Sequence, residues 1–404
     1  MAEVSKEHDT GVENLSRAEE YVDCGFAYGE KGYESVIVDI TEIIRFNHNY
    51  EEAYYDRGIV YYDIRLDPDD AEAYFERGYA YGEKGDVDLA IADYTEAIKL
   101  DPDAVAAYYN RGNAYDRKGD YDLAIADYTE VIRLDPNFAD TYCNRGNAYH
   151  HMGDYDLAIA DHTEAIRLAP NDAAMYYNRG ISYHHKGYYD LAIAEYTEAI
   201  RLEPNYAATY YNRGSAYYRK GNYDLAIAEY TEAIRLDPNH TSAYYKRGHT
   251  YYDNGNYDLA ILDYTEAIRF DPNDAAVYYL RGDTYDKIGD YSLAIADYAE
   301  AIRLDPNYAD AYDGRGVAYV RMGIYDLAIV DFTEAIRLNP NYATAYRNRG
   351  IAYEENDDYD LALADYIEAA RLDPNSVEVY FVATPITTST ATIWPFQIVP
   401  RLSA

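Results

Sequence analysis

Two adjacent histidine pairs are the side chains in this sequence best suited to metal or proton chemistry. His150 and His151 form the first pair, and His184 and His185 follow 34 residues later. Adjacent residues on a helix point in different directions, so only one histidine of each pair can face a common centre. Two imidazoles are fewer protein ligands than a zinc site uses. We therefore predict no metal site, and the pairs favour a polar or pH-sensitive surface.

The other reactive residue types form no catalytic pattern. The sequence contains no glycine-rich phosphate loop, no nucleophile elbow and no H-E-x-x-H motif. Cys24 and Cys143 lie far apart and neither belongs to a C-x-x-C pair, so neither a disulfide framework nor a zinc site is implied. We predict that the protein is not an enzyme, that it has no catalytic residues and no cofactor, and that it resides in a reducing cytoplasm.

The charge of the chain excludes further classes of partner. The 73 acidic residues outnumber the 35 basic ones and give a formal charge of −38. Such a surface repels the phosphates of nucleic acids and of anionic membranes. No stretch approaches eighteen consecutive apolar residues, and the acidic first twenty residues do not resemble a secretion signal. Other proteins or peptides remain as the expected partners, with no nucleic acid and no membrane.

Proline recurs with a period of 34 residues, which is typical of a stacked array of one helical unit. The periodic prolines are Pro68, Pro102, Pro136, Pro170, Pro204, Pro238, Pro272, Pro306, Pro340 and Pro374. Residues 105–138 serve as the example, numbered as positions 1 to 34. They predict a first helix ended by Gly119 and a second helix from about Tyr121 to Leu134. Pro136 follows that second helix, and Asn137 is placed to cap the next one.

The apolar side chains of the example repeat follow helical spacing. Its first helix carries one stripe formed by Tyr108, Gly112 and Tyr115. The second helix has an apolar side consisting of Ala124, Ile125, Tyr128, Val131 and Ile132. Together, Tyr108, Gly112, Tyr115, Gly119, Ala124, Tyr128 and Pro136 resemble the tetratricopeptide repeat (TPR) pattern of aromatic, glycine and proline residues. The resemblance implies an all-α fold: a right-handed α-solenoid of stacked antiparallel helix pairs, or TPR superhelix.

Two residue types recur inside the first helix and need a physical reason. A glycine at position 8 costs about 1 kcal/mol relative to alanine. It recurs at Gly78, Gly112, Gly146, Gly180, Gly214, Gly248, Gly282, Gly316 and Gly350. We expect close helix approach, with the small Ala124 opposite. Position 7 holds arginine where the family usually has leucine, and we expect this arginine to pair with Asp127 or Glu130. A structural role is favoured, with ligand binding as the alternative.

The repeats divide the chain into four predicted segments. Residues 1–17 are polar and expected to be disordered. Residues 18–70 hold two degenerate repeats, one of 33 and one of 20 residues, which we expect to form a distinct three-helix cap. Nine regular repeats span 71–376. Residues 377–404 begin another first helix and then lose the pattern. This tail is either disordered or packed against the last repeat or in the groove, and the ends of such a stack are candidates for self-association.

The resemblance to TPR superhelices implies that first-helix positions 2, 5, 6, 9, 12 and 13 line a concave groove. Between 105 and 240 these positions hold only two acids and two bases, Asp116, Asp140, Arg117 and Arg219. Rigid aromatic rings and amides suit an extended peptide. The predicted peptide-binding groove comprises Tyr109, Asn110, Asn113, Asn144, Asn147, His150, Tyr177, Asn178, His184, Tyr211, Asn212 and Tyr218.

Asparagine occupies position 6 in four successive repeats, at Asn110, Asn144, Asn178 and Asn212. This row is similar to the asparagine ladder in the TPR arm of O-linked N-acetylglucosamine transferase, which grips peptide backbone. An amide can donate to a peptide carbonyl and accept from a peptide N–H. Asparagine is also a common choice at this position in regular TPR arrays, so the row alone does not decide between the two interpretations.

Three classes of function remain to be compared. The leading hypothesis is a non-catalytic scaffold that binds proteins or extended peptides in the groove. The alternative is an adaptor that presents clients to a chaperone or a separate enzyme. Some TPR adaptors clamp a carboxylate with lysine, but the first lysine position of that clamp holds residues such as Phe75, Tyr109 and Cys143. An enzyme is disfavoured because the carboxylates recur with the repeat, and we interpret Asp127, Asp161 and Glu195 as part of a solvated outer face.

Overall fold

The computed structural model describes residues 69–374, and these form two compact units. The first unit ends at Ala216 and the second begins at Tyr217, so the division falls within helix α12. Each unit is considered by itself below. The predicted polar segment 1–17, the predicted cap 18–70 (apart from its last two residues) and the predicted tail 377–404 lie outside the described residues.

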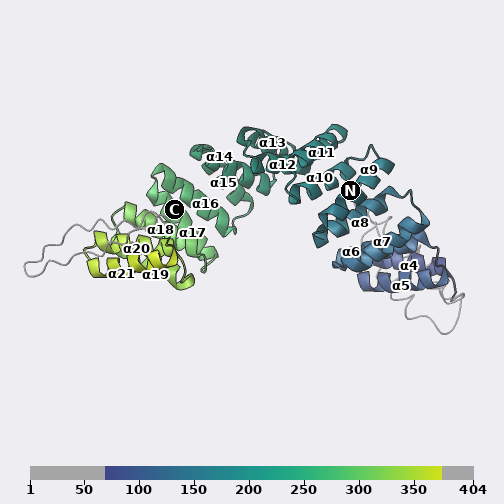
Figure 1. Ribbon diagram of the computed structural model, residues 1–404, viewed down its shortest axis with the longest axis horizontal. Helices are drawn as coiled ribbons and strands as arrows, with labels where there is room; N and C mark the ends of the chain where they lie inside the picture. The colour runs from purple at the N-terminus through teal and green to yellow at the C-terminus, as the bar shows by residue number, and fades with distance from the viewer. Residues whose placement is uncertain (1–68, 375–404) are drawn as a thin grey trace, which may run out of the picture. The chain divides into compact units, whose positions relative to one another are not determined.

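The described residues form eighteen helices and no strands (Figure 1). The first helices of the repeats are α4 (Ala71–Lys84), α6 (Val105–Lys118), α8 (Ala139–Met152), α10 (Ala173–His185), α12 (Ala207–Arg219), α14 (Thr241–Asp253), α16 (Ala275–Ile288), α18 (Ala309–Arg321) and α20 (Ala343–Glu355). The second helices are α5 (Val87–Leu100), α7 (Tyr121–Leu134), α9 (Tyr155–Leu168), α11 (Tyr189–Leu202), α13 (Tyr223–Leu236), α15 (Tyr257–Phe270), α17 (Tyr291–Leu304), α19 (Tyr325–Leu338) and α21 (Tyr359–Leu372). The all-α architecture of stacked helix pairs is confirmed.

The helix ends follow the predicted punctuation with one exception. Gly119 ends α6 in the left-handed conformation, with φ of 80°, where glycine has no steric penalty. Asn137 does not cap α8, so that prediction is wrong. The capping position is Phe138, and the Asn137 backbone N–H instead donates to Asp135 Oδ1 at 3.0 Å. Capping by a side chain occurs one residue later in other repeats, where Asp70 accepts from the backbone of α4.

The core of each helix pair is built from alanines and one large ring. Ala124 and Tyr128 are almost fully buried, as predicted, and Val131 is buried beside them. On the first helix the buried residues are Ala107, Gly112 and Ala114. The predicted stripe is therefore only partly correct, because its two tyrosines are half-buried. They flank an arginine instead of filling the core.

The mid-helix glycine allows close packing against the ring of the second helix. A Cβ atom added to Gly112 would lie 2.7 Å from Cε1 of Tyr128, closer than such contacts occur. The predicted close approach is confirmed. In two repeats the alanine at the Ala124 position also lies opposite the glycine, because a Cβ added to Gly146 or Gly282 would lie 3.2 Å from the backbone oxygen of Ala158 or 3.3 Å from that of Ala294. At Gly112 the three nearest atoms all belong to the Tyr128 ring. The position-8 glycine therefore accommodates the largest side chain of the core.

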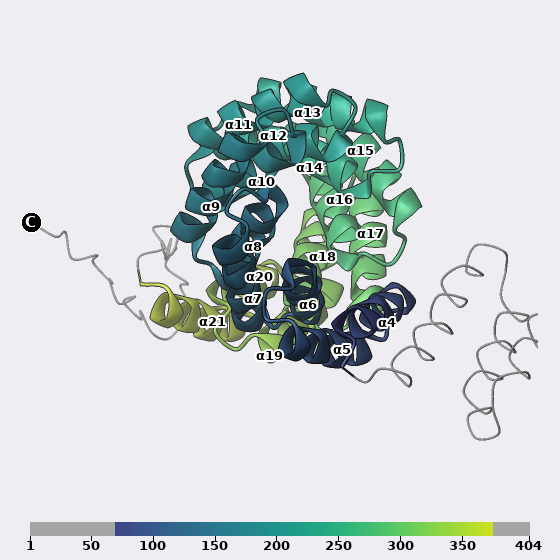
Figure 2. The same cartoon turned by 90° about the vertical axis from the view of Figure 1, so that its right-hand side faces the viewer.

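First helices form the inner layer within each unit. In the first unit α4 contacts α6, α6 contacts α8 and α8 contacts α10, and in the second unit α16 contacts α18 and α18 contacts α20. Successive second helices make no comparable contact among the described residues. Figure 2 shows α8 and α10 on the inner side of the first unit, with α9 and α11 outside them. The first-helix layer is thus the inner face of each stack.

Candidate protein-binding surface

An arginine at position 7 fixes the orientation of each first helix. Arg111 donates from Nε and Nη2 to both carboxylate oxygens of Asp127, at 2.8 and 2.7 Å. Its guanidinium lies 5.6 Å from the ring centroid of Tyr108 and 6.0 Å from that of Tyr115. The predicted pairing with Asp127 is confirmed. Glu130, the other candidate, pairs with Arg133 instead.

These ion pairs correct the interpretation of the acidic residues. Asp127 and Asp161 are only 5% and 8% exposed, and Glu195 pairs with Arg179 at 2.7 Å. The prediction that they belong to a solvated outer face is wrong. They recur with the repeat because each holds an arginine in the interior, where an unpaired charge would be costly. Sequence periodicity alone does not separate a buried repeating acid from an exposed one.

All of the predicted groove residues are half-buried. In the first unit the position-6 amides tie successive first helices together. Asn144 Nδ2 donates to Tyr109 Oη at 3.1 Å, and Asn212 Nδ2 donates to Tyr177 Oη at 2.8 Å. Asn110 instead donates to the Ala106 carbonyl of its own helix. The bonds from Asn144 to Tyr109 and from Asn212 to Tyr177 join position 6 of one repeat to position 5 of the repeat before it.

Asn113 receives two hydrogen bonds at the start of the row. Its Oδ1 accepts from Tyr128 Oη at 2.8 Å and from Asn144 Nδ2 at 3.0 Å. The Tyr109 ring packs against Phe138, with a centroid separation of 4.8 Å. Desolvation raises the pKa of Tyr109, so its hydroxyl stays neutral. These contacts fix the predicted side chains before any partner arrives.

The centre of the row depends on two residues that the sequence analysis did not assign. Cys143 Sγ accepts from Asn178 Nδ2 at 3.2 Å, and Asn147 Oδ1 lies 3.1 Å from His162 Nε2. Burial raises the pKa of the Cys143 thiol to about 11, so it is not a nucleophile at neutral pH. Burial also lowers the pKa of His162 to about 4. The sequence signal for this site was a break in the repeat, because His162 stands where most other repeats have tyrosine.

One histidine from each predicted pair meets the other. The His150 and His185 rings are 4.9 Å apart and nearly perpendicular, and His150 Nδ1 lies 3.3 Å from Ser182 Oγ. Desolvation, followed by the neighbouring His185 and His151, lowers the pKa of His150 to about 4. His184 lies against Tyr189 on α11. Within residues 69–374, no group of three or more candidate ligands is arranged to hold a metal ion.

The last residues of the predicted row are divided between the two units. Tyr211 is half-buried on α12 in the first unit. Tyr218 belongs to the second unit, where its hydroxyl donates to Asp253 Oδ2 at 2.6 Å. The second unit also repeats the inter-repeat tie with a carboxylate, because Asn348 Nδ2 donates to Asp313 Oδ1 at 3.0 Å. Burial raises the pKa of this carboxyl to about 6.

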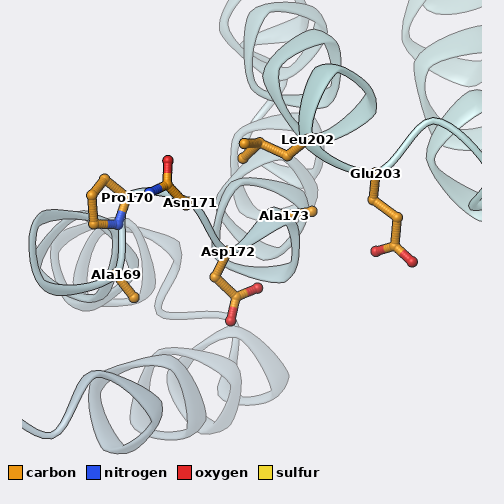
Figure 3. A pocket seen from close by; sticks show the side chains of 7 residues that line it. All are labelled: Ala169, Pro170, Asn171, Asp172, Ala173, Leu202 and Glu203. Atoms are coloured by element: carbon orange, nitrogen blue, oxygen red, sulfur yellow. The ribbon is translucent and has the colours of Figure 1, made fainter.

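A shallow pocket lies away from the predicted residues (Figure 3). It is lined by the turn before α10 and by the end of α11: Ala169, Pro170, Asn171, Asp172, Ala173, Leu202 and Glu203. Asp172 caps α10 by accepting from the Ala174 backbone N–H. The side chains shown do not converge on a common point. The pocket therefore offers no arrangement of groups for catalysis.

Family models for tetratricopeptide repeats match most of the chain. One, described as TPR repeat, matches residues 182–221, 214–255, 248–289 and 282–323. A second model, described as Tetratricopeptide repeat, matches residues 52–102, 75–137 and 314–377. A third model with the same description matches residues 139–172. Comparison with curated protein sequences gives no match. Within the described residues, no helix is long and apolar enough to cross a membrane.

Several solved structures resemble the chain at the level of the repeats. MamA is 32% identical over 40% of this chain and 94% of its own, with a TM-score of 0.39. YrrB, described as a TPR protein with an unusual peptide-binding site, is 25% identical over 45% of this chain and 93% of its own, with a TM-score of 0.40. The Cut9–Hcn1 structure is 18% identical over 81% of this chain and 82% of its own, with a TM-score of 0.44.

Proposed function

Because the chain belongs to the tetratricopeptide repeat family, whose members are protein-interaction scaffolds, we propose that it is a non-catalytic scaffold binding partner proteins or extended peptides. The proposed binding surface is the inner face of the first unit. The observation that carries this proposal is the row of amide ties between successive first helices. The ties fix asparagine, tyrosine and cysteine side chains in one polar, nearly uncharged row.

The ties leave one side of each amide available to a partner. Asn144, Asn178 and Asn212 donate through Nδ2 to the preceding repeat, while their Oδ1 atoms accept no hydrogen bond within the described residues. An amide oxygen with no partner in the stack can accept from a backbone N–H of an extended peptide. Prior ordering of these side chains lowers the entropic cost of binding. Such a surface holds peptide backbone with little discrimination between sequences.

The alternative role as a chaperone adaptor has less support from these residues. A carboxylate clamp needs a cation at position 5, but that position holds Tyr109, Cys143 and Tyr177 in the first unit. All three accept hydrogen bonds from the following repeat. They are therefore committed to the stack and carry no positive charge. A scaffold that contacts peptide backbone fits this row better than one that reads a terminal carboxylate.

The test replaces the three tie-forming amides together. The triple variant Asn144→Ala, Asn178→Ala and Asn212→Ala is compared with the unmodified full chain in a quantitative pull-down. Each lost hydrogen bond costs on the order of 0.5–1.5 kcal/mol, while alanine raises helix propensity. The stack is therefore expected to fold, as checked by circular dichroism, and to bind its recovered partners at least tenfold more weakly.

The matched control lies on the outer face of the same repeats. Glu130, Glu164 and Glu198 form exposed ion pairs with an arginine three residues later. Replacing these three glutamates with glutamine changes the charge outside the inner face. Because exposed ion pairs contribute little to stability, the free energy of unfolding should change little. We expect unchanged partner recovery. Normal binding by the folded amide triple, together with loss of binding by the glutamate triple, would place the interaction on the outer face instead.

A further inference from the structure

The outer face carries an exposed leucine in every described repeat. Position 19 holds leucine at the start of each second helix, with exposed fractions between 43% and 51%. The row comprises Leu89, Leu123, Leu157, Leu191, Leu225, Leu259, Leu293, Leu327 and Leu361. Single exposed leucines need no explanation, but repeated exposure at one structural position produces an aligned row.

The second unit enlarges this row on α15 and α19. Position 22 lies one helical turn beyond position 19 on the same face and is usually alanine. Leu262 on α15 and Val330 on α19 replace that alanine, and each is 62% exposed. The two second helices thus present Leu259 with Leu262 and Leu327 with Val330. Leu293 occupies position 19 on α17, the second helix between them in sequence.

Apolar residues from the turns adjoin the same face. Asn356 Nδ2 lies 3.5 Å from Asp326 Oδ1, which places position 14 of one repeat beside position 18 of the preceding repeat. In two other repeats of the second unit, position 14 holds Ile288 and Met322, each 45% exposed. By the same register, Ile288 lies beside Asp258 on α15. In the first unit this position holds Lys84, Lys118 and Lys186, which form ion pairs, and Met152, which is 44% exposed.

We define the outer apolar patch as Leu259, Leu262, Ile288, Leu293, Leu327 and Val330. Its two borders differ in charge. On the side of the helix N-termini lie the exposed Asp258, Asp290 and Asp326. On the other side, Glu266, Glu300 and Glu334 each pair with an arginine three residues later. One border is therefore acidic and the other is internally neutralised.

We propose that the outer apolar patch docks an amphipathic helix of a partner protein, with leucine-like side chains on the patch and lysine or arginine facing the aspartate border. A helix of 18 residues is about 27 Å long, enough to cross three neighbouring helices about 10 Å wide. The cationic partner complements the aspartates and the formal charge of −38. A second copy of this chain would meet the patch with like charge.

The test uses a defined probe and the full chain. An 18-residue fluorescein-labelled peptide of leucine and lysine in amphipathic helical order is titrated at physiological salt, with binding followed by fluorescence anisotropy. The patch variant combines Leu262→Gln, Leu293→Gln and Val330→Gln. We expect it to bind the peptide at least tenfold more weakly, because the apolar contacts are lost while the aspartate border is retained.

A matched triple separates the patch from general attraction to an acidic protein. Leu89→Gln, Leu123→Gln and Leu157→Gln change three leucines of similar exposure in the first unit. This control is expected to bind within twofold of the unmodified chain. A leucine–glutamate peptide of the same pattern should bind at least tenfold more weakly than the leucine–lysine peptide. Circular dichroism melting confirms that both triples remain folded.

Three results would overturn the proposal. Equal loss in both triples would mean that the peptide senses the leucine row and not the patch. Equal binding of the two peptides would remove the charge argument for a basic partner. Sedimentation showing a dimer of the unmodified chain that the patch triple dissociates would identify a second copy as the occupant.

Discussion

Arg111 and Asp127 form a two-bonded ion pair between the first and second helices of one repeat, with N–O distances of 2.8 and 2.7 Å. Arg111 Nη1 also donates to Thr95 Oγ1 of the preceding repeat at 3.1 Å. One guanidinium therefore joins three helices. The same arrangement of arginine and acid recurs at Arg77–Asp93, Arg145–Asp161, Arg179–Glu195, Arg247–Asp263, Arg281–Asp297, Arg315–Asp331 and Arg349–Asp365.

The first prediction compares two acids on helix α7. Asp127→Ala leaves the Arg111 guanidinium partly buried without its carboxylate, which typically costs about 3–5 kcal/mol. Glu130→Ala breaks an exposed pair with Arg133 and should cost less than about 0.5 kcal/mol. Urea unfolding followed by circular dichroism measures both. Similar losses in the two variants would contradict the assignment of Asp127 as the structural acid.

The second prediction concerns two glycines with different surroundings. Gly112→Ala should destabilise the stack by about 1–3 kcal/mol, because the new methyl group would lie 2.7 Å from the Tyr128 ring. Gly82→Ala introduces a methyl group 3.6 Å from Tyr94 Oη, an ordinary contact, and should stabilise helix α4 by up to about 1 kcal/mol. Thermal melting reports both changes. Stabilisation by Gly112→Ala would refute the close-packing explanation.

The fold could be predicted from sequence because its signals are local and repeated. Gly119 ends its helix as expected, and α7 spans Tyr121–Leu134 as predicted. The pairing of Arg111 was narrowed to Asp127 or Glu130, which lie three residues apart on one helix face. Only the structure decides between them, because the decision depends on which carboxylate is buried by the neighbouring first helix.

The internal contacts of the binding surface were not predictable from the same signals. The hydrogen bond from Asn144 to Tyr109 joins residues 35 apart. Helical spacing places both side chains on the inner face but does not state whether they point to a partner or to each other. The cap assigned to Asn137 failed for a related reason. The Asp135 carboxylate, two residues earlier, accepts a hydrogen bond from the Asn137 backbone N–H, and Phe138 occupies the capping position.

The third prediction concerns the buried histidine on α9. Burial lowers the pKa of His162 to about 4, whereas an unfolded histidine titrates near 6.5. Between these values the unfolded chain binds a proton that the folded chain does not, so the folded state loses stability as pH falls. His162→Tyr removes this effect and restores the residue found in neighbouring repeats. Its hydroxyl can donate to Asn147 as Tyr128 donates to Asn113.

Melting curves at two pH values test this substitution. His162→Tyr should raise the melting temperature at pH 8 and raise it further at pH 5, where the histidine costs about 2 kcal/mol. His150, whose pKa is also lowered, is present in both proteins and so cancels in the comparison. An equal advantage at both pH values would show that packing, and not the ionisation of His162, determines the gain.

The last prediction concerns a buried carboxylate in the second unit. Asp313 is 8% exposed, and its carboxylate is bonded by the amide of Asn348. Burial is the main cause that raises the pKa of Asp313 to about 6, against about 3.9 in an unfolded chain. The pKa of Asp313 is higher in the folded state than in the unfolded state. The free energy of unfolding is therefore highest below about pH 3.9 and decreases as the pH rises through 6. At pH 7.5 the folded state therefore carries a penalty of up to about 3 kcal/mol.

Asp313→Asn keeps the shape and an oxygen that can accept from Asn348, but it has no charge to desolvate. It should raise the melting temperature at pH 7.5 and give a smaller gain at pH 5. Asp310→Asn serves as the control, since it removes a neighbouring carboxylate that also raises the pKa of Asp313. We expect a smaller gain from that variant, and a larger one would mean that charge repulsion and not burial determines the cost.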